Sequence, residues 1–280
     1  MLALAPSAAM TAQGRGEGRA SVGVIGGSGL YRFLDDAEEL EVDTPYGPPS
    51  DLVTVAELEG RRVAFLPRHG SRHTIPPHRI NYRANLWALQ SLGVERVIAP
   101  CAVGSLRPEH APGSMVVVDQ YVDRTSSRRD TYFDGPPVVH LSAADPYCDQ
   151  LRPLAVASAR AAGMAVRAGG TVVVVNGPRF GTRAESRFHA AMGWDVVNMT
   201  QYPEVTLARE LGLCYVALAL VTDYDSGFED DPGVAPVTSA EVFAVFQRST
   251  DRVRAAIRHL VSTIPAERSC SCHPAPTTIH

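Results

Sequence analysis

The stretch that decides the fold runs from residue 195 to residue 225 and reads DVVNMTQYPEVTLARELGLCYVALALVTDYD. It opens with the apolar pair Val196 and Val197, and its middle carries apolar residues at the spacing of a helix. Residues 214–221 are all apolar or small, which is typical of a strand buried on both faces. The stretch therefore predicts a strand, a helix and a second strand.

Polar side chains follow both strands of this unit. Asn198 and Thr200, with Met199 between them, come after the first strand, and Asp223 and Asp225 come after the second. In an open α/β sheet, ligands bind at the carboxyl ends of the strands. Two carboxylates after an uncharged strand favour a binding site. An acidic loop that only ends the strand remains the alternative.

The rest of the chain repeats the alternation of strands and helices. Strands are expected at residues 21–25, 62–66, 96–99, 115–118 and 171–175, and helices at 82–92, 151–163 and 239–264. Residues 100–105 and 119–134 are expected to be loops. With no repeat and no linker, we expect one three-layer α/β/α domain over residues 21–265, with a mixed, largely parallel sheet. Residues 1–20 are expected to be disordered and residues 266–280 to form a flexible tail.

Composition narrows the classes of function. The chain has 280 residues and a net charge of −4, which argues against nucleic-acid binding because that needs a basic face. No apolar run is long enough to span a membrane, and the first residues lack the basic region of a signal peptide. Five scattered cysteines do not make a secreted disulfide framework. These features predict a cytoplasmic protein.

Two loops have residues suited to phosphate. Gly26, Gly27, Ser28 and Gly29 follow the first strand, and small residues let backbone N–H groups approach an anion. The string is not a Walker loop, and it can also form a simple tight turn. Arg68 and His69 follow a second strand as potential cations, and the planar fork of Arg suits phosphate. The alternative is a surface arginine beside a structural histidine.

Metal binding is not expected. His73 and His78 lie in a Pro-rich loop at a spacing that does not fit one face of a helix. The tail string Cys270-Ser271-Cys272-His273 could be a metal or redox clip, but a structural zinc site needs four ligands. We favour tail thiols that can pair with each other and have no catalytic role.

Several strings occur together: VGVIGGSGLY, DTPYGPPSD, RHGSRHTIPPHRINYRAN, GSLRP, DQYVDRT, GPRFGTRAES, NMTQYPE and TDYD. Through them the chain, from about residue 22 to residue 265, resembles the trimeric purine nucleoside phosphorylases, and among these the methylthioadenosine phosphorylases most. The resemblance implies reversible phosphorolysis of S-methyl-5′-thioadenosine to adenine and 5-methylthioribose 1-phosphate. It also implies a homotrimer, with inorganic phosphate as co-substrate and no metal or organic cofactor.

The resemblance also assigns roles to residues of this chain. Phosphate would be bound by Ser28, Arg68, His69, Cys101, the backbone of Ala102, and Thr200, and the ribose by Met199. The base would be held by Phe180, Asp223 and Asp225, with Asp223 as the catalytic acid. The 5′ substituent would lie against Ser239, Val242, Phe243 and a neighbouring subunit's copy of His140. Relatives usually carry Thr where Cys101 stands, and a thiol is a weaker donor.

Three alternatives remain open. A phosphorylase for 6-oxopurine nucleosides would tend to carry Asn in place of Asp223, the first Asp of TDYD. A phosphorylase for another 5′-deoxyadenosine, such as a halogenated one, or for adenosine itself, would differ at the 5′ pocket. A non-catalytic purine sensor would be expected to lose the phosphate ligands, whereas Ser28, Arg68 and Thr200 are present.

Overall fold

The computed structural model describes residues 19–27, 30, 33–136, 138–226, 238–272 and 277–278. Its helices are α1 Tyr82–Ser91, α2 Leu151–Ala161, α3 Arg183–Ala191, α4 Gln201–Glu210 and α5 Ser239–Thr263, with a short 3₁₀ turn at Pro77–Arg79. The strands of the main sheet are β1 Val22–Gly26, β2 Glu38–Leu40, β3 Val53–Leu58, β4 Arg61–Pro67, β5 Arg96–Ser105, β6 Met115–Val117, β7 Gln120–Arg124, β9 Val166–Ala168, β10 Thr171–Val175, β11 Val196–Asn198 and β12 Cys214–Tyr224. The strands β8 Val139–His140 and β13 Thr277–Thr278 form a separate pair.

The sheet is mixed and organised around β5 and β12. These two strands run parallel from Cys214 opposite Arg96 to Tyr224 opposite Ser105. On its other edge, β5 pairs first with β1 in parallel and at its end with β11 in antiparallel orientation. The carboxyl ends of β5 and β12 therefore lie side by side, at the edge of the sheet where a ligand is expected to bind.

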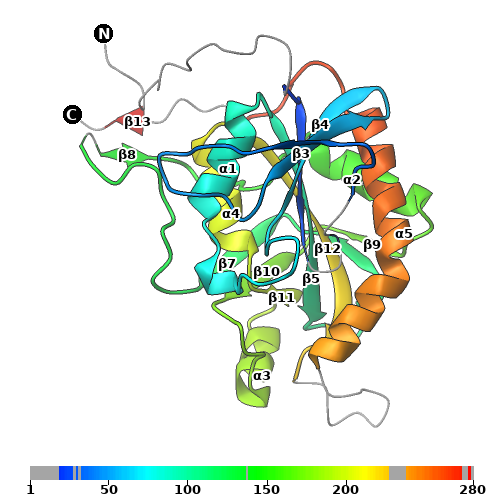
Figure 1. The fold of residues 1–280 in the computed structure, drawn as a ribbon. Coiled ribbons are helices and arrows are strands. Elements are labelled where there is room, and N and C mark those ends of the chain that lie inside the picture. The colour runs from blue at the N-terminus through cyan, green and yellow to red at the C-terminus, as the bar shows by residue number, and fades with distance from the viewer. Residues whose placement is uncertain are drawn as a thin grey trace.

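Helices cover both faces of this sheet (Figure 1). One apolar core lies between the sheet and helices α1 and α4, and the other lies between the sheet and helices α2 and α5. Side chains of β12 alternate between them: Tyr215, Ala217 and Ala219 belong to the first core, and Cys214, Val216 and Leu218 to the second. Because helices cover both faces of the sheet, neither set of alternating β12 side chains needs to be polar. The predicted three-layer α/β/α domain is confirmed.

Two strands are longer than predicted. Residues 100–105, expected to form a loop, continue β5, and β12 continues past Val221 to Tyr224. The loop prediction was wrong because Pro100 and the small residues after it are paired along their length by β12, so tertiary pairing overrides their local preference. The expected loop 119–134 likewise begins with a strand, β7, which pairs with β10.

The ends of the chain bear on the predicted domain limits. Residues 1–18 lie outside the described residues. After α5, Arg96 donates to the carbonyl oxygens of Pro265 and Ala266, and Arg268 donates to that of Gly212 at 2.6 Å. Further on, Thr277 in β13 pairs with His140 in β8. The limits 21–265 and 266–280 stay predictions.

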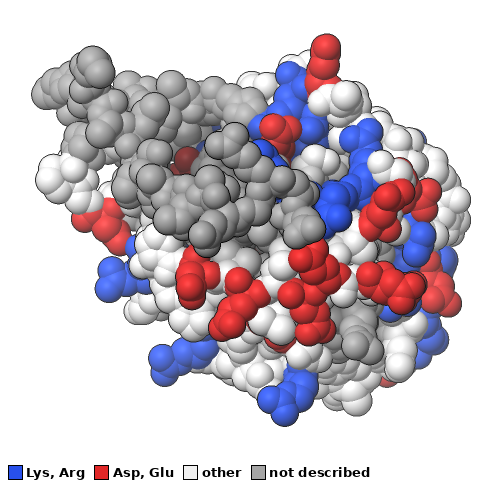
Figure 2. Space-filling view, turned by 45° about the horizontal axis from the view of Figure 1, so that its top comes forward, with Lys and Arg blue, Asp and Glu red and all other residues white. Residues whose placement is uncertain are grey.

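The surface shows no strong segregation of charge on the face in Figure 2, where acidic and basic side chains of the described residues are interspersed. Among the described helices, none combines the length and the apolar character needed to cross a membrane.

Candidate active site

A cavity of about 390 Å³ opens at the carboxyl ends of β5, β10, β11 and β12. It brings together most of the residues singled out from the sequence: Arg68, His69, Cys101, Ala102, Phe180, Met199, Thr200, Asp223, Asp225, Ser239, Val242 and Phe243. Gly27 also lines the cavity, whereas Ser28 lies outside the described residues. His140 is exposed in β8 and does not line it.

A β-bulge places the two carboxylates. The register between β12 and β5 shifts between Val221 and Asp223, so that Thr222 is the extra residue. The Thr222 hydroxyl lies 3.2 Å from the carbonyl oxygen of Val103 and 2.7 Å from Asp223 Oδ2. Bulges re-aim side chains and are common beside active sites. This one lets an otherwise apolar strand end with two acids lining a cavity.

Burial controls the protonation of these acids. Asp223 and Asp225 are 8% and 4% exposed. Burial raises the pKa of Asp223 to about 7, and the hydrogen bond from Thr222 opposes this rise only in part. Burial also raises the pKa of Asp225, against hydrogen bonds from Ser186 and the Ser226 backbone. Near neutral pH, Asp223 can therefore hold a proton and donate it.

Gly104 leaves the space that Asp223 occupies. A Cβ at position 104 would lie 3.0 Å from Asp223 Oδ1, 3.1 Å from Val197 Cγ1 and 3.4 Å from Asp225 Cβ. These contacts are tight, so a side chain on β5 would displace the carboxylate on β12. The glycine thus fixes how deeply the acid sits beside the neighbouring strand.

Arg68 is held by a buried acid. Its Nε and Nη2 donate to the two carboxylate oxygens of Glu204 at 2.6 and 2.8 Å, and both side chains are at most 1% exposed. Nη1 also donates to the carbonyl oxygen of Pro100, and Nη2 to that of Ile25. Burial alone would lower the pKa of Arg68, but the charge of Glu204 raises it above its ordinary value. Of the five guanidinium N–H donors, one on Nη1 has no partner among the described residues, and Arg68 lines the cavity.

Asn198 organises the turn that carries Met199 and Thr200. Its Oδ1 accepts from the backbone N–H groups of Thr200 and Gln201 at 2.6 and 2.8 Å, and its Nδ2 donates to the carbonyl oxygen of Ala102 at 3.0 Å. The amide therefore ties the start of α4 to β5. This fixes the backbone of Thr200, which lines the cavity.

His69 and Cys101 are neutral groups near Arg68. Burial lowers the pKa of His69 to about 4, and a ring nitrogen, Nδ1, lies 2.8 Å from the carbonyl oxygen of Ile75. His69 is therefore not the cation that the sequence suggested, because burial outweighs its basicity. Burial raises the pKa of Cys101 to about 11, and its sulfur accepts from the Gln201 side-chain amide at 3.2 Å.

The far end of the cavity is apolar. The ring of Phe243 in α5 packs edge-on against His73 at 5.5 Å between centroids, and Val242 and Ile75 line the wall nearby. The sequence left open whether Ser239 only caps α5. Thr238 takes that position, accepting from the backbone N–H of Glu241, and Ser239 lines the cavity.

Three structural contributors were missed from the sequence. Glu204 lies within the string NMTQYPE, but nothing local marks a glutamate as buried. Asn198 had a signal, since it follows a strand and begins a helix, which is a common place for an Asn side chain to bind backbone N–H groups. In the sequence Gly104 is only one of several small residues, because its role in leaving space for Asp223 depends on the neighbouring strand β12.

The comparisons with known proteins agree with this geometry. The family model described as "Phosphorylase superfamily" matches residues 21–262. A purine nucleoside phosphorylase of Streptomyces coelicolor is 57% identical over 267 residues, covering 92% of this chain and 94% of the relative. An S-methyl-5′-thioadenosine phosphorylase of Mycolicibacterium smegmatis is 54% identical over 252 residues, covering 89% and 93%.

A solved structure gives the same result. The methylthioadenosine phosphorylase of Schistosoma mansoni in complex with adenine superposes with a TM-score of 0.84 at 38% identity, covering 89% of this chain and 93% of that one. This chain therefore belongs to the phosphorylase superfamily.

Proposed function

We propose that this protein is a purine nucleoside phosphorylase that splits S-methyl-5′-thioadenosine with phosphate into adenine and 5-methylthioribose 1-phosphate. The observation that carries the proposal is one cavity that holds both a buried acid, Asp223, and a buried cation, Arg68. The reaction needs both, because it joins an anionic nucleophile to the sugar and releases a base that must gain a proton.

The chemistry follows from these two groups. A phosphate oxygen attacks C1′ and forms the new C–O bond while the C1′–N9 bond breaks and its electron pair moves into the purine. Asp223 donates its proton to N7 and leaves as a carboxylate. The remaining Arg68 donor, Thr200 and the Ala102 backbone hold the phosphate close to the sugar, whose positive charge in the transition state it stabilises. No metal or organic cofactor takes part in this scheme.

Base selection rests on Asp225. A carboxylate can accept from a 6-amino group, whereas a 6-oxo group has no donor to offer it. Phe180 walls the base, and the backbone of Met199 lies toward the ribose. The two acids thus have separate roles: Asp223 protonates the ring, and Asp225 reads the exocyclic group.

The 5′ wall favours a methylthio group. Val242, Phe243 and Ile75 offer an apolar surface, which a methylthio group can cover and a 5′-hydroxyl cannot hydrogen-bond. The relatives named S-methyl-5′-thioadenosine phosphorylase support this choice, as does a Schistosoma mansoni variant solved in complex with methylthioadenosine, which matches with a TM-score of 0.83 at 37% identity. The Streptomyces coelicolor relative, named only purine nucleoside phosphorylase, makes a broader nucleoside specificity the second candidate.

The assembly and location are part of the proposal. His140 lies outside its own cavity, which fits a residue that lines the 5′ pocket of a neighbouring subunit in a homotrimer. We place the enzyme in the cytoplasm, acting in purine and methionine salvage.

The direct test is phosphate-dependent release of adenine, followed by the change in ultraviolet absorbance. Purified protein should convert methylthioadenosine only when phosphate or arsenate is present, and methylthioribose 1-phosphate should form in equal amount with phosphate. Release of adenine without phosphate would indicate a hydrolase. Binding of the nucleoside with no turnover would indicate a sensor.

A further inference from the structure

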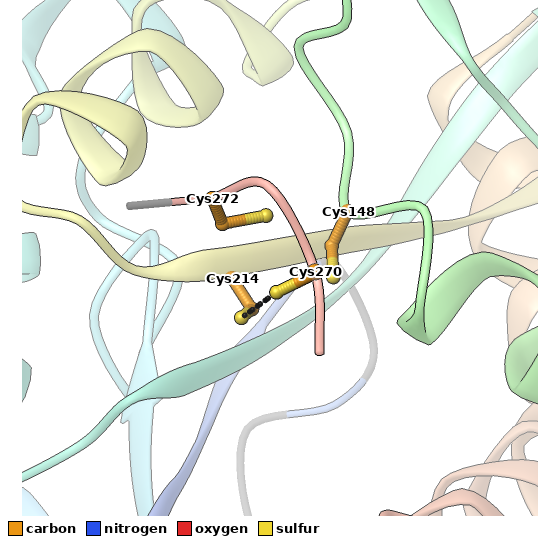
Figure 3. A group of neighbouring side chains, drawn as sticks. All are labelled: Cys148, Cys214, Cys270 and Cys272. Atoms are coloured by element: carbon orange, nitrogen blue, oxygen red, sulfur yellow. Dashed lines mark hydrogen bonds between the residues drawn. The ribbon is translucent and has the colours of Figure 1, made fainter. Parts of the chain in front are cut away.

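Four cysteines from distant parts of the sequence meet at the amino end of β12. Cys148 precedes α2, Cys214 opens β12, and Cys270 and Cys272 come from the segment after α5. Their four Sγ atoms all lie within 4.8 Å of one another. Figure 3 shows the tail segment arching over β12, with its two thiols turned toward those of Cys214 and Cys148. The sequence alone showed only the two tail thiols, so it could not supply a four-ligand set.

The group is separate from the active site. None of these cysteines lines the cavity. Asp223 lies nine positions after Cys214 in β12, which at about 3.3 Å per residue places the two residues about 30 Å apart. At that distance the four thiols cannot contact a ligand in this chain's own cavity.

The sulfur geometry suits a tetrahedral metal ion. Zinc binds thiolates at about 2.3 Å, which places neighbouring sulfurs about 3.8 Å apart. All five cysteines of the chain are free, and the sulfurs of Cys214 and Cys270 lie 3.3 Å apart, far longer than the bond of a disulfide. Cys148, Cys214 and Cys272 are buried, which would keep water from an ion bound there. Four thiolates in a tetrahedral arrangement suit zinc, and the other candidates for such ligands are copper(I) and iron–sulfur clusters.

A buried cation beside the sulfurs supports a charged cluster. Arg209, 7% exposed, directs Nη1 toward the Cys272 sulfur at 3.9 Å, and its Nε has no hydrogen-bond partner among the described residues. A buried guanidinium keeps its charge and is costly to leave uncompensated. Four thiolates around a divalent ion carry a net negative charge, which would offset that of Arg209. Neutral thiols or disulfides would not.

The tail around the cluster is already fixed to the core. Gln150, two residues after Cys148, donates to the carbonyl oxygen of Glu267 at 3.2 Å and to the Ser269 hydroxyl at 2.9 Å. The backbone N–H of Cys148 donates to the carbonyl oxygen of Tyr215 at 2.9 Å, next to Cys214. None of these contacts uses a sulfur atom, and by holding the tail beside α2 and β12 they would lower the entropic cost of forming the site.

We propose that one structural zinc ion is bound by Cys148, Cys214, Cys270 and Cys272. The ion would link the segment after α5 to the start of β12 and to the residues just before α2.

The test begins with the metal content of the full chain. The protein is expressed in zinc-supplemented medium and purified without oxygen or chelator, and zinc, iron and copper are measured by mass spectrometry. We expect one zinc per chain. Protein without bound metal, or with iron or copper in its place, would overturn the proposal. So would alkylation under denaturing conditions that finds these cysteines in disulfides.

Variants then locate the ion. Cys270→Ser should lose the zinc and melt at lower temperature. Two controls should keep the zinc: Ser271→Ala, at the exposed neighbour of Cys270, and Cys101→Ser, at the one cysteine outside the cluster. If Cys270→Ser does not fold, the wild-type protein still decides: stripping the zinc should lower the melting temperature, and adding zinc back should restore it. Cobalt in place of zinc should give the absorption bands of a tetrahedral thiolate site. Zinc that stays bound in Cys270→Ser would overturn the assignment.

Discussion

The Arg68 guanidinium and the Glu204 carboxylate form a two-point ion pair, at 2.6 and 2.8 Å, that is almost completely withdrawn from solvent. The Tyr215 hydroxyl donates to the same carboxylate at 2.7 Å. The pair joins the end of β4 to α4 and β12, so the cation that would meet phosphate is fixed by three elements. Stability and the proposed phosphate binding are therefore coupled at this residue.

Removing one partner of the pair should destabilise the fold. Arg68→Ala leaves the Glu204 charge buried without compensation, and we expect the free energy of unfolding to fall by about 3–5 kcal/mol. The exposed pair Arg62 and Glu38, at 3.4 Å, gives a matched control, and Arg62→Ala should cost at most about 1 kcal/mol. Urea denaturation measures both. Equal midpoints for Arg68→Ala and wild type would contradict the buried pair.

Asp223 should control the pH dependence of catalysis. Because burial raises its pKa to about 7, the protonated acid is lost as pH rises through that value, and kcat/KM should fall on the alkaline side. Phosphate also titrates near neutral pH, so Asp223→Asn is the control: a limb that disappears in this variant belongs to Asp223. Turnover in Asp223→Ala should drop by roughly 10²–10⁴-fold. A variant with near-normal kcat would rule out the acid role.

The same shift has a consequence for stability. The folded protein holds the Asp223 proton up to about pH 7, whereas the unfolded chain releases it near the ordinary value of 3.8. Between these values the folded state binds more protons, so the contribution of Asp223 to stability falls as pH rises. Asp223→Asn should flatten that part of the profile of melting temperature against pH.

Asp225 should set the preference for a 6-amino group. In Asp225→Asn the amide can also donate to a 6-oxo group, so the preference for methylthioadenosine over methylthioinosine should shrink. Losing one such buried hydrogen bond is worth about 1–3 kcal/mol, or about 5–150-fold in the ratio of the two kcat/KM values. The ratio is measured by parallel assays of both nucleosides. An unchanged ratio would assign base selection to another residue.

Gly104 offers a test of how the acid is positioned. Gly104→Ala would place a Cβ 3.0 Å from Asp223 Oδ1, so we expect lower kcat with little change in the KM for phosphate. Gly135→Ala is the matched control, because a Cβ there meets nothing within 4 Å. Steady-state kinetics of both variants decide the point. Full activity in Gly104→Ala would show that the carboxylate can shift without loss.

The sequence predicted the layers of the fold but not the full length of the central strands. Period and composition identified the unit at residues 195–225, and the apolar run of β12 indicated burial on both faces. The continuation of β5 through Pro100 could not be predicted, because it depends on pairing with β12 more than a hundred residues away. The bulge at Thr222 is invisible for the same reason: it exists only as a difference in register between two strands.

The site was predictable where polar residues end a strand and not where a role depends on burial. Because Asp223, Asp225 and Thr200 follow apolar runs, the sequence indicated that they lie at the ends of strands. Glu204 looked like any helical glutamate, and His69 looked like a cation until burial lowered its pKa. The zinc ligands show the same limit, since Cys148 and Cys214 carry no local signal and meet the tail only in the folded chain.

The apolar wall at the far end of the cavity should decide which 5′ group is accepted. Val242 and Phe243 lie one turn into α5, and the Phe243 ring rests on His73. This wall gives a methylthio or halogen substituent a surface to cover, and neither Val242 nor Phe243 can hydrogen-bond a 5′-hydroxyl. We therefore expect kcat/KM for methylthioadenosine to exceed that for adenosine by roughly 10–200-fold, as for one buried methyl-sized group.

Phe243→Ala tests this wall directly. Truncating the ring opens the pocket to water, so the preference for methylthioadenosine over adenosine should fall. The KM for phosphate should stay unchanged, because the ring has no group that donates to an anion. The exposed Phe188, 49% accessible and outside the cavity, provides the control variant Phe188→Ala. Methylthioadenosine, a 5′-halo-5′-deoxyadenosine and adenosine are compared side by side. If kcat/KM for adenosine equals or exceeds that for the other two nucleosides in the wild-type enzyme, the protein is a general adenosine phosphorylase. A clearly higher kcat/KM for the halogenated nucleoside would indicate a different 5′-deoxyadenosine as substrate.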